Sequence, residues 1–220
     1  MIKVFGKKEE KGRKSANPFG LFIVFLGPDG AGKTSVIANI ESHLAKSFAR
    51  TVRFHLRPHF GRERLGTATV SNPHSVAPRC VVGSWAKVML WWLDYVSGYC
   101  GKVAPELRRS TLVIFDRYAD DLAVDPKRYR YGGPRWLARL LPSVVPRPDL
   151  AFVLVADPRV IYARKAEVSF LETVRQVQAY RELAKERGMI LVDAGLPIHE
   201  VAASILEEIR GWLERRDGRR

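Results

Sequence analysis

Leu21-Phe-Ile-Val-Phe-Leu-Gly-Pro-Asp-Gly-Ala-Gly-Lys-Thr-Ser35 is the stretch that decides the fold of this 220-residue chain. Its six apolar residues predict a buried strand, and the residues that follow, Ser35 to Leu44, are compatible with a helix. Between them, Gly27-x-x-x-x-Gly32-Lys33-Thr34 has the P-loop spacing, in which backbone N–H groups surround phosphate oxygens. The strand–loop–helix setting is the one the motif requires, so we expect a nucleoside triphosphate to bind here.

The letters of the motif assign expected roles. Lys33 can reach the β- and γ-phosphates, and the Thr34 hydroxyl can hold Mg²⁺. We therefore expect ATP and Mg²⁺ as cofactors. The predicted nucleotide-binding residues of this loop are Gly27, Pro28, Asp29, Gly30, Ala31, Gly32, Lys33, Thr34 and Ser35.

The net charge of +14 is the unusual feature of an otherwise ordinary composition, which is 46% apolar and 27% charged. Residues 1–14 hold six Lys or Arg against two Glu, and residues 210–220 hold five Arg against two acids. We expect a basic tail at 1–18, one kinase domain at 19–213 and a second basic tail at 214–220. The tails are either solvated and mobile or weakly attracted to a membrane surface or anionic glycan; no specific nucleic-acid partner is expected.

The two cysteines, Cys80 and Cys100, have no metal-binding or redox spacing. The opening residues are polar and charged, unlike a signal peptide. Both features favour a reducing compartment, and we expect a cytoplasmic location.

Five short apolar runs predict strands, at 21–26, 51–57, 112–115, 150–155 and 189–192. Helices are expected at 33–46, 85–96, 134–141, 159–165, 167–187 and 198–215, and a long loop at 60–79. The helix at 85–96 has only six consecutive apolar residues, far fewer than the ~20 that cross a bilayer. We expect it to be buried or to form an interface between two copies of the chain, with an interfacial membrane helix as the alternative.

Strands that alternate with helix-length segments predict an α/β fold, a doubly wound parallel sheet with helices on both faces. Ligands of such sheets bind beyond the carboxyl ends of the strands. Every notable polar cluster of this chain falls at such an end: 27–34, 55–59, 116–117 and 157. We therefore expect one composite site at that edge.

Asp116 follows four apolar residues, the position at which NTPases place a carboxylate for Mg²⁺. Arg117 beside it suits a phosphoryl group, and the alternative is a structural Asp–Arg pair. Asp29 lies inside the phosphate loop, where its charge needs compensation by an acceptor hydroxyl or by Mg²⁺; a loop-stabilising role is the alternative. Arg164 follows the fourth strand. It is expected either to belong to a cationic lid that closes on the transferred phosphoryl group or to lie on a solvated helix face. Arg57, at the end of the second strand, can hold an anionic group of an acceptor.

The chain resembles the thymidylate kinases of the nucleoside-monophosphate kinase superfamily from about residue 20 to 210. The motifs that carry the resemblance are Gly27-Pro-Asp-Gly-Ala-Gly-Lys-Thr34, Pro105-Glu-Leu with Asp116-Arg-Tyr118, Asp157-Pro158, Tyr180-Arg-Glu-Leu-Ala184 and Val192-Asp-Ala-Gly-Leu-Pro197. The resemblance implies a five-stranded parallel sheet and transfer of the ATP γ-phosphoryl group to dTMP. It also implies that Asp29 faces the acceptor sugar, that Arg117 faces the acceptor phosphate, and that the Asp193–Pro197 loop, which includes Ala194, lies near the adenine.

From the residues and the resemblance together, the expected catalytic residues are Lys33, Asp29, Arg117 and Arg164, and the expected metal ligands are Thr34 and Asp116. The expected acceptor-binding residues are Arg57, Trp91, Tyr95, Arg117, Asp120 and Asp121.

The acceptor side departs from the family pattern. Tyr95 stands where the family has a thymine-reading arginine, and Asp120 and Asp121 follow the Asp-Arg-Tyr motif in place of the family's residues. A divergent subgroup, whose members tend to be encoded among surface-polysaccharide genes, looks similar through 55–58, 72–74, 125–133 and 163–167. Two alternatives to a nucleoside monophosphate kinase therefore stay open: a kinase of a surface-polysaccharide sugar, and a non-catalytic nucleotide-binding protein.

Overall fold

The computed structural model describes residues 19–58 and 77–218. Its centre is a five-stranded, all-parallel sheet, as expected, and the strand order is β2-β3-β1-β4-β5. The strands are β1 (Leu21–Leu26), β2 (Arg50–His55), β3 (Thr111–Asp116), β4 (Leu150–Val155) and β5 (Ile190–Asp193). All residues of β1 and β3 are buried, because these strands are covered on both faces and their sequences are almost continuously apolar.

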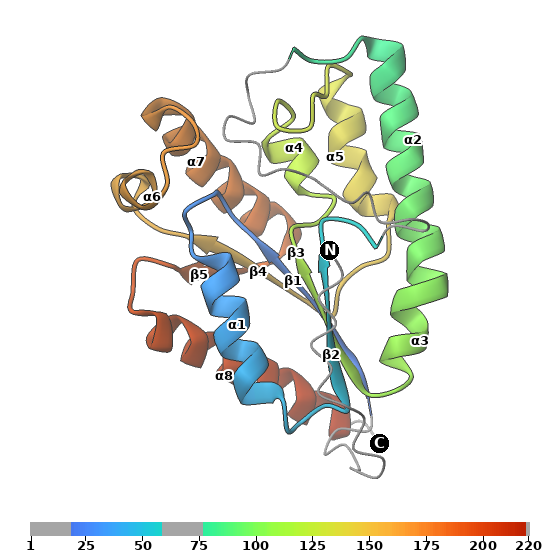
Figure 1. Ribbon diagram of the computed structural model, residues 1–220, viewed down its shortest axis with the longest axis vertical. Helices are drawn as coiled ribbons and strands as arrows, with labels where there is room; N and C mark the ends of the chain where they lie inside the picture. Colours follow the sequence, from blue (N-terminus) through green and yellow to red (C-terminus); the bar gives the residue numbers. More distant parts are fainter. Residues whose placement is uncertain (1–18, 59–76, 219–220) are drawn as a thin grey trace.

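The helices connect the parallel strands and cover both faces of the sheet. They are α1 (Lys33–Leu44), α2 (Val81–Gly98), α3 (Ala104–Leu107), α4 (Asp121–Val124), α5 (Arg135–Val144), α6 (Pro158–Arg164), α7 (Phe170–Arg187) and α8 (Ile198–Asp217), with a π-helical turn at Tyr99–Val103. Figure 1 shows α1 packed beside α8, and α2, α5, α4 and α7 following one another across the other side of the molecule. The doubly wound arrangement is therefore confirmed.

The largest differences from the predicted elements lie in the connection between β2 and β3. The helix expected at 85–96 begins at Val81, and a π-helical turn and the short α3 continue it to Leu107. Cys80 explains the earlier start, because its backbone is extended and its sulfur accepts a hydrogen bond from the Gly83 N–H. The short helix α4 was not expected.

Two predictions on chain organisation lie wholly or mainly outside the described residues. The tail at 1–18 is one, and most of the loop at 60–79 is the other. At the other end, α8 continues to Asp217, past the expected domain boundary at 213. No helix in the described ranges is both long and apolar enough to cross a membrane.

Candidate active site

The carboxyl ends of β1, β2 and β3 meet at one edge of the sheet. Phe25 of β1 is in register with Asp116 of β3, and Asp116 is in register with His55 of β2. The loop after β1, residues 27–32, therefore lies beside Asp116 and Arg117, which come more than eighty residues later in the sequence. In Figure 1, β1 leads through this loop into α1 at the edge where β3 ends.

The phosphate loop has glycine at positions whose positive φ disfavours other residues. Gly27 has a φ of 138°, and a Cβ atom there would lie 2.2 Å from the carbonyl oxygen of Leu154. Gly32 has a φ of 80° and forms the N-terminal cap of α1, where it leaves the first backbone N–H groups of the helix directed into the loop. The backbone thus has the conformation that the motif predicted.

Lys33 is folded into this loop. Its Nζ donates hydrogen bonds of 2.8 Å to the carbonyl oxygens of Gly27 and Pro28. Burial and the nearby Arg117 lower the pKa of Lys33 to about 8, against the opposing effect of Asp29 and Asp116. A buried ammonium group at the helix N-terminus makes this loop a site for an anion.

Asp116 has the properties of a metal ligand that acts together with other groups. Its Oδ2 accepts a 2.8 Å hydrogen bond from Arg53, while its buried Oδ1 has no hydrogen-bond partner among the described residues. Burial alone would raise the pKa of Asp116, but Lys33, His55 and Arg53 together lower it. Thr34, the other predicted ligand, is exposed at the start of α1.

The described residues contain no cluster of three or more His, Cys, Asp or Glu side chains that could hold a metal ion by itself. The orphaned Oδ1 of Asp116 and the Thr34 hydroxyl are hard oxygen donors, which fit Mg²⁺. This ion commonly takes few protein ligands and completes its shell with water and phosphate oxygens.

Asp29 and Arg117 are brought together, as the pattern of the site suggested, but the partners differ from those expected. Both Arg117 and Arg128 donate hydrogen bonds to the Asp29 carboxylate. Burial would raise the pKa of Asp29, yet Arg117, Lys33 and Arg128 hold it well below its usual range. In this structure two guanidinium groups compensate the charge of Asp29, where an acceptor hydroxyl or Mg²⁺ had been expected.

Arg117 is held rigidly below the loop. Its backbone has a φ of 76°, and its N–H donates to the carbonyl oxygen of Phe25. Its Nη1 donates a 2.6 Å hydrogen bond to Asp121, whose other oxygen accepts one of 2.8 Å from Tyr180. Burial would lower the pKa of Arg117, but the charge of Asp121 raises it well above its ordinary value. Arg117 therefore remains charged, and its guanidinium group has a fixed direction.

Sequence reasoning missed two residues that complete this charged cluster. Arg128 contacts Asp29, and Glu167 lies 3.7 Å from Arg128 and 2.7 Å from Lys165. Both belong to the segments 125–133 and 163–167, which had been noted only as subgroup motifs. The charged residues of these two segments had no role assigned to them from the sequence, and that was the feature that could have pointed to Arg128 and Glu167.

The expected acceptor-binding residues on β2 and α2 lie apart from those on the segment after β3, and Arg57, Trp91 and Tyr95 form the first group. Arg57 and Trp91 lie together, with the Arg57 guanidinium 4.9 Å from the centre of the Trp91 ring. Tyr95 is 1% exposed, and its hydroxyl donates a 2.5 Å hydrogen bond to the carbonyl oxygen of Leu56. Tyr95 therefore supports the turn after β2, and its polar atom is already occupied.

Asp120 and Asp121 do not line an open pocket, because both are buried. Asp121 acts on the site through Arg117, whereas Asp120 points to Arg187 of α7, with 3.3 Å between the closest oxygen and nitrogen. Adjacent residues at the start of the short helix α4 point in different directions, which explains why the two side chains separate.

The structure does not bring Arg164 into the cluster around Lys33. Its Nη1 donates a 2.9 Å hydrogen bond to the carbonyl oxygen of Ala194, so Arg164 joins α6 to the loop after β5. Ala194 is buried, and its N–H donates to the carbonyl oxygen of Val155. These two residues therefore form a separate part of the site edge, beside β4 and β5.

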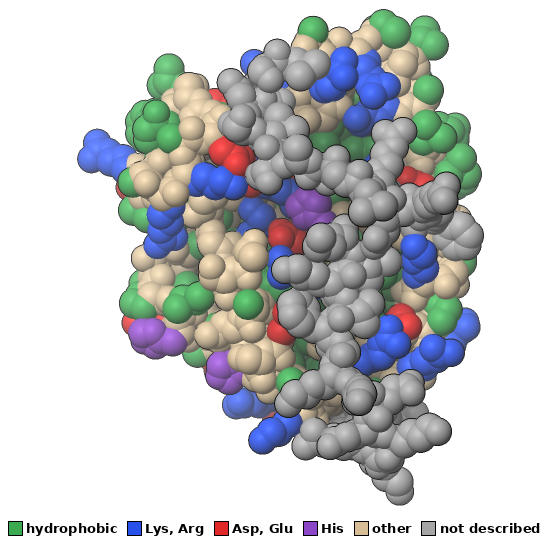
Figure 2. Space-filling model, in the orientation of Figure 1, with side chains coloured by type: hydrophobic (Ala, Val, Ile, Leu, Met, Phe, Trp, Pro, Cys, Tyr) green, Lys and Arg blue, Asp and Glu red, His purple; other side chains and the backbone are tan. Residues whose placement is uncertain are grey.

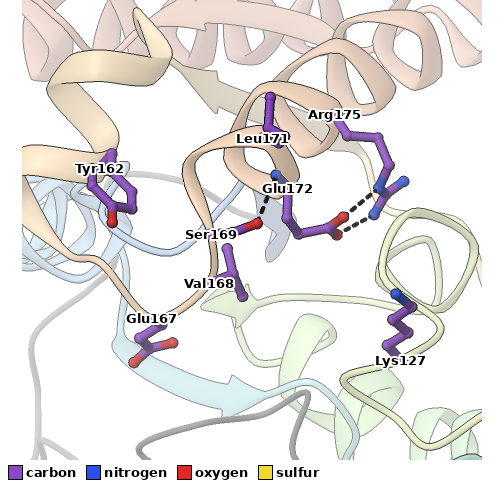
Figure 3. A pocket seen from close by; sticks show the side chains of 8 residues that line it. All are labelled: Lys127, Tyr162, Glu167, Val168, Ser169, Leu171, Glu172 and Arg175. Atoms are coloured by element: carbon purple, nitrogen blue, oxygen red, sulfur yellow. Dashed lines mark hydrogen bonds and ion pairs between the residues drawn. The ribbon is translucent and has the colours of Figure 1, made fainter.

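A hollow of about 700 Å³ lies between the start of α7 and the loop at 125–133. Figure 3 shows its lining, in which Glu167 and Lys127 stand on opposite sides and Glu172 accepts hydrogen bonds from Arg175. Glu167 connects the hollow with the charged cluster. None of the residues predicted for the site lines it.

This fold and this edge define a class of protein. A parallel sheet with a P-loop after its central strand, and an Asp-Arg pair at the end of the neighbouring strand, is the architecture of a P-loop nucleotide kinase.

Comparison with known proteins identifies the family. The model of the thymidylate kinase family matches residues 86–205. A probable thymidylate kinase of Pyrobaculum calidifontis is 31% identical over 201 residues, covering 84% of this chain and 94% of its own. One from Pyrobaculum aerophilum is 29% identical over 199 residues, covering 86% and 96%. The chain belongs to the thymidylate kinase family and is a phosphotransferase of the nucleotide kinase type.

A solved structure agrees with the fold. The crystal structure of thymidylate kinase from Ehrlichia chaffeensis has a TM-score of 0.59 to this chain, covering 87% of this chain and 100% of its own. Its sequence is 18% identical, so this similarity supports the architecture alone.

Proposed function

We propose that the protein transfers the γ-phosphoryl group of ATP to the phosphate of a nucleoside monophosphate, with dTMP as the first acceptor to test. The observation that carries the proposal is the meeting of Lys33 in the phosphate loop with Arg117, which is held against the same loop through Asp29. In the reaction the bond between the γ-phosphorus and the β,γ-bridging oxygen breaks, and a bond to an acceptor phosphate oxygen forms. ADP leaves.

The donor is expected to bind along the loop 27–35. Phosphate oxygens would take the Lys33 ammonium from the carbonyl oxygens of Gly27 and Pro28, and Ala194 would lie beside the adenine. Thr34 and Asp116 would hold Mg²⁺, which supplies charge neutralisation between the β- and γ-phosphates.

Positioning and charge are the protein's main contributions to this reaction, because phosphoryl transfer needs little covalent chemistry from side chains. Arg117 and Arg128, both on the Asp29 carboxylate, stand where an anionic acceptor would enter. We propose that Arg117 binds the acceptor phosphate and that Asp29 keeps the two guanidinium groups apart and directed. Arg164, from the lid side, would approach the transferred group only after movement of α6.

The alternatives are less well supported. Matches along most of the chain to proteins named thymidylate kinase favour a nucleotide over a surface-polysaccharide sugar as the acceptor. Intact Lys33, Asp116 and Arg117 geometry favours an enzyme over a non-catalytic nucleotide-binding protein.

Lys33→Ala tests the donor assignment. We expect it to abolish phosphoryl transfer from ATP to dTMP while thermal unfolding shows a folded protein. The assay follows ADP formation and deoxythymidine diphosphate by chromatography. Lys46→Ala is the matched control, because Lys46 is exposed at the end of α1 and is expected to keep full activity. Undiminished transfer by Lys33→Ala would refute the assignment.

We also propose that two copies of the chain associate through α2. Val82, Met89, Leu90 and Leu93 of this helix are 48–78% exposed, a larger apolar surface than scattered single side chains would give. Trp85 of α2 contacts Trp136 of α5, with ring centres 5.5 Å apart, so the apolar surface spans two helices. A cytoplasmic location, and attraction of the tails to a membrane surface or anionic glycan, stay predictions.

A further inference from the structure

Two cationic side chains pack on Trp91, beyond the Arg117 cluster, and two further arginines lie close enough to act on Lys87. The Arg57 guanidinium lies 4.9 Å and the Lys87 ammonium 5.3 Å from the centre of the Trp91 ring. Arg79 and Arg130 are joined by a backbone hydrogen bond of 3.0 Å, and both lower the pKa of Lys87. We call these residues the Trp91 cation cluster: Arg57, Arg79, Lys87 and Arg130.

The positive charge of this cluster is poorly compensated. Asp94, 2.5 Å from Arg57, is the only carboxylate that forms an ion pair with any of the four among the described residues. Burial and the three arginines lower the pKa of Lys87 to about 8. The buried Nε of Arg57 has no hydrogen-bond partner in the described part of the chain. Arg57 and Lys87 are half-buried, whereas Arg79 and Arg130 are exposed. Like charges this close repel one another, so a bound anion would stabilise the arrangement.

The cluster belongs to the same side of the site as Arg117. Trp91 contacts Tyr129, with 5.1 Å between the ring centres, and the Tyr129 hydroxyl lies 3.3 Å from the Asp121 carboxylate that holds Arg117. The loop that carries Tyr129 and Arg130 is tied to α2, because the Gly132 N–H donates a 2.9 Å hydrogen bond to buried Ser84. Figure 2 shows lysine and arginine side chains gathered on this part of the surface.

Trp91 has no free ring face on which the base of a ligand could stack. Trp91 is 4% exposed, and its ring is occupied by Arg57 and Lys87 together with Tyr129. What this end of the site offers a ligand is therefore N–H donors and positive charge. Such groups bind phosphate and carboxylate oxygens.

We propose that the acceptor carries a second anionic group, a phosphate or a carboxylate, which binds the Trp91 cation cluster while the acceptor's 5′-phosphate binds near Arg117. This inference rests on the proposed function and deepens it, since it specifies the substrate class of the same site. The second anion takes no part in the transfer step and leaves with the product. It distinguishes the preferred acceptor from dTMP, whose base is neutral.

Equilibrium binding separates this inference from the proposed function. Three ligands are compared at 150 mM salt with a non-hydrolysable ATP analogue and Mg²⁺ present: dTMP, thymidine 3′,5′-bisphosphate, and 5-carboxy-2′-deoxyuridine 5′-monophosphate. The second carries its extra anion on the sugar and the third on the base. Because hydrogen bonds to charged groups are stronger than those between neutral groups, at least one of the two should bind about tenfold or more tightly than dTMP.

Lys87→Gln and the exposed Arg130→Gln should each reduce that preference about tenfold or abolish it, by weakening the dianionic ligand more than dTMP. Lys46→Gln removes the same charge from a distant part of the surface and should preserve the preference, which controls for overall electrostatic attraction. Equal binding of all three ligands would overturn the inference, as would a preference that survives both variants. Failure of the proposed function has a different signature, because no ADP would then form with any acceptor, whatever the binding constants.

Discussion

Asp120 and Asp121 are adjacent and both buried, yet the structure predicts opposite effects for the same substitution. The Asp121 carboxylate is 0% exposed and accepts hydrogen bonds from Arg117 at 2.6 Å and Tyr180 at 2.8 Å. The Asp120 carboxylate forms an ion pair with Arg187, at 3.3 Å, and its buried Oδ1 accepts no hydrogen bond from the described residues. The charge of Asp121 is thus well compensated, whereas Asp120 has a longer ion pair with a partly exposed arginine.

Asp121→Asn should destabilise the protein by about 3 kcal/mol. Removing one partner of a buried ion pair costs about 3–5 kcal/mol, and the retained amide oxygen places this change at the lower end. For a chain of this size, each kcal/mol lowers the melting temperature by about 2–4 °C, so we expect a fall of about 6–12 °C. The turnover number should also fall, because Arg117 loses the carboxylate that directs it.

Asp120→Asn should leave the protein at least as stable as the unsubstituted chain at pH 8. Burial raises the pKa of Asp120 to about 6, against the lowering effect of Arg187. The pKa of Asp120 is thus higher in the folded protein than in the unfolded chain, where it is about 4. Its contribution to the free energy of unfolding is therefore fully present below about pH 4 and is lost as the pH rises through about 6. Replacing the carboxylate removes that loss, and the advantage of the variant should shrink towards pH 5.

Thermal and denaturant unfolding of both variants at pH 8 and pH 5 measure these effects. The reasoning would be refuted if Asp121→Asn unfolded within 1 kcal/mol of the unsubstituted protein, or if Asp120→Asn were equally destabilised. A shared loss would mean that both carboxylates are structural in the same way.

The remaining predictions concern the site and the surface of α2. Arg128→Gln removes one of the two guanidinium groups from Asp29 and should lower kcat/KM for the acceptor about tenfold or more, with a smaller effect on the KM for ATP. Steady-state kinetics with each substrate varied in turn would check this, and an effect confined to ATP would contradict it. Leu90→Asp places a charge on the exposed apolar face of α2 and should convert a dimer to monomers in light scattering, while Lys102→Asp should not; an unchanged mass would rule out this interface.

Much of the donor side could be predicted from the sequence, because its determinants are local. Gly27, Gly32 and Lys33 lie within one short segment of the sequence, and their spacing alone predicts a phosphate-binding loop. The buried strands could be recognised by their apolar runs, and their alternation with helices predicted a parallel sheet. The short apolar run of the helix at 85–96 likewise excluded a bilayer crossing from the sequence alone, in agreement with the described helices.

The acceptor side was decided by tertiary structure. Asp29 meets Arg117 and Arg128, which are 88 and 99 residues away, only because β1 and β3 are neighbours in the sheet. Nothing local distinguishes the adjacent Asp120 and Asp121, since their different fates depend on which distant helix or arginine each carboxylate faces. Short-range spacing determines how a backbone turn binds phosphate, but the partner of a buried charge is determined by strand order and packing.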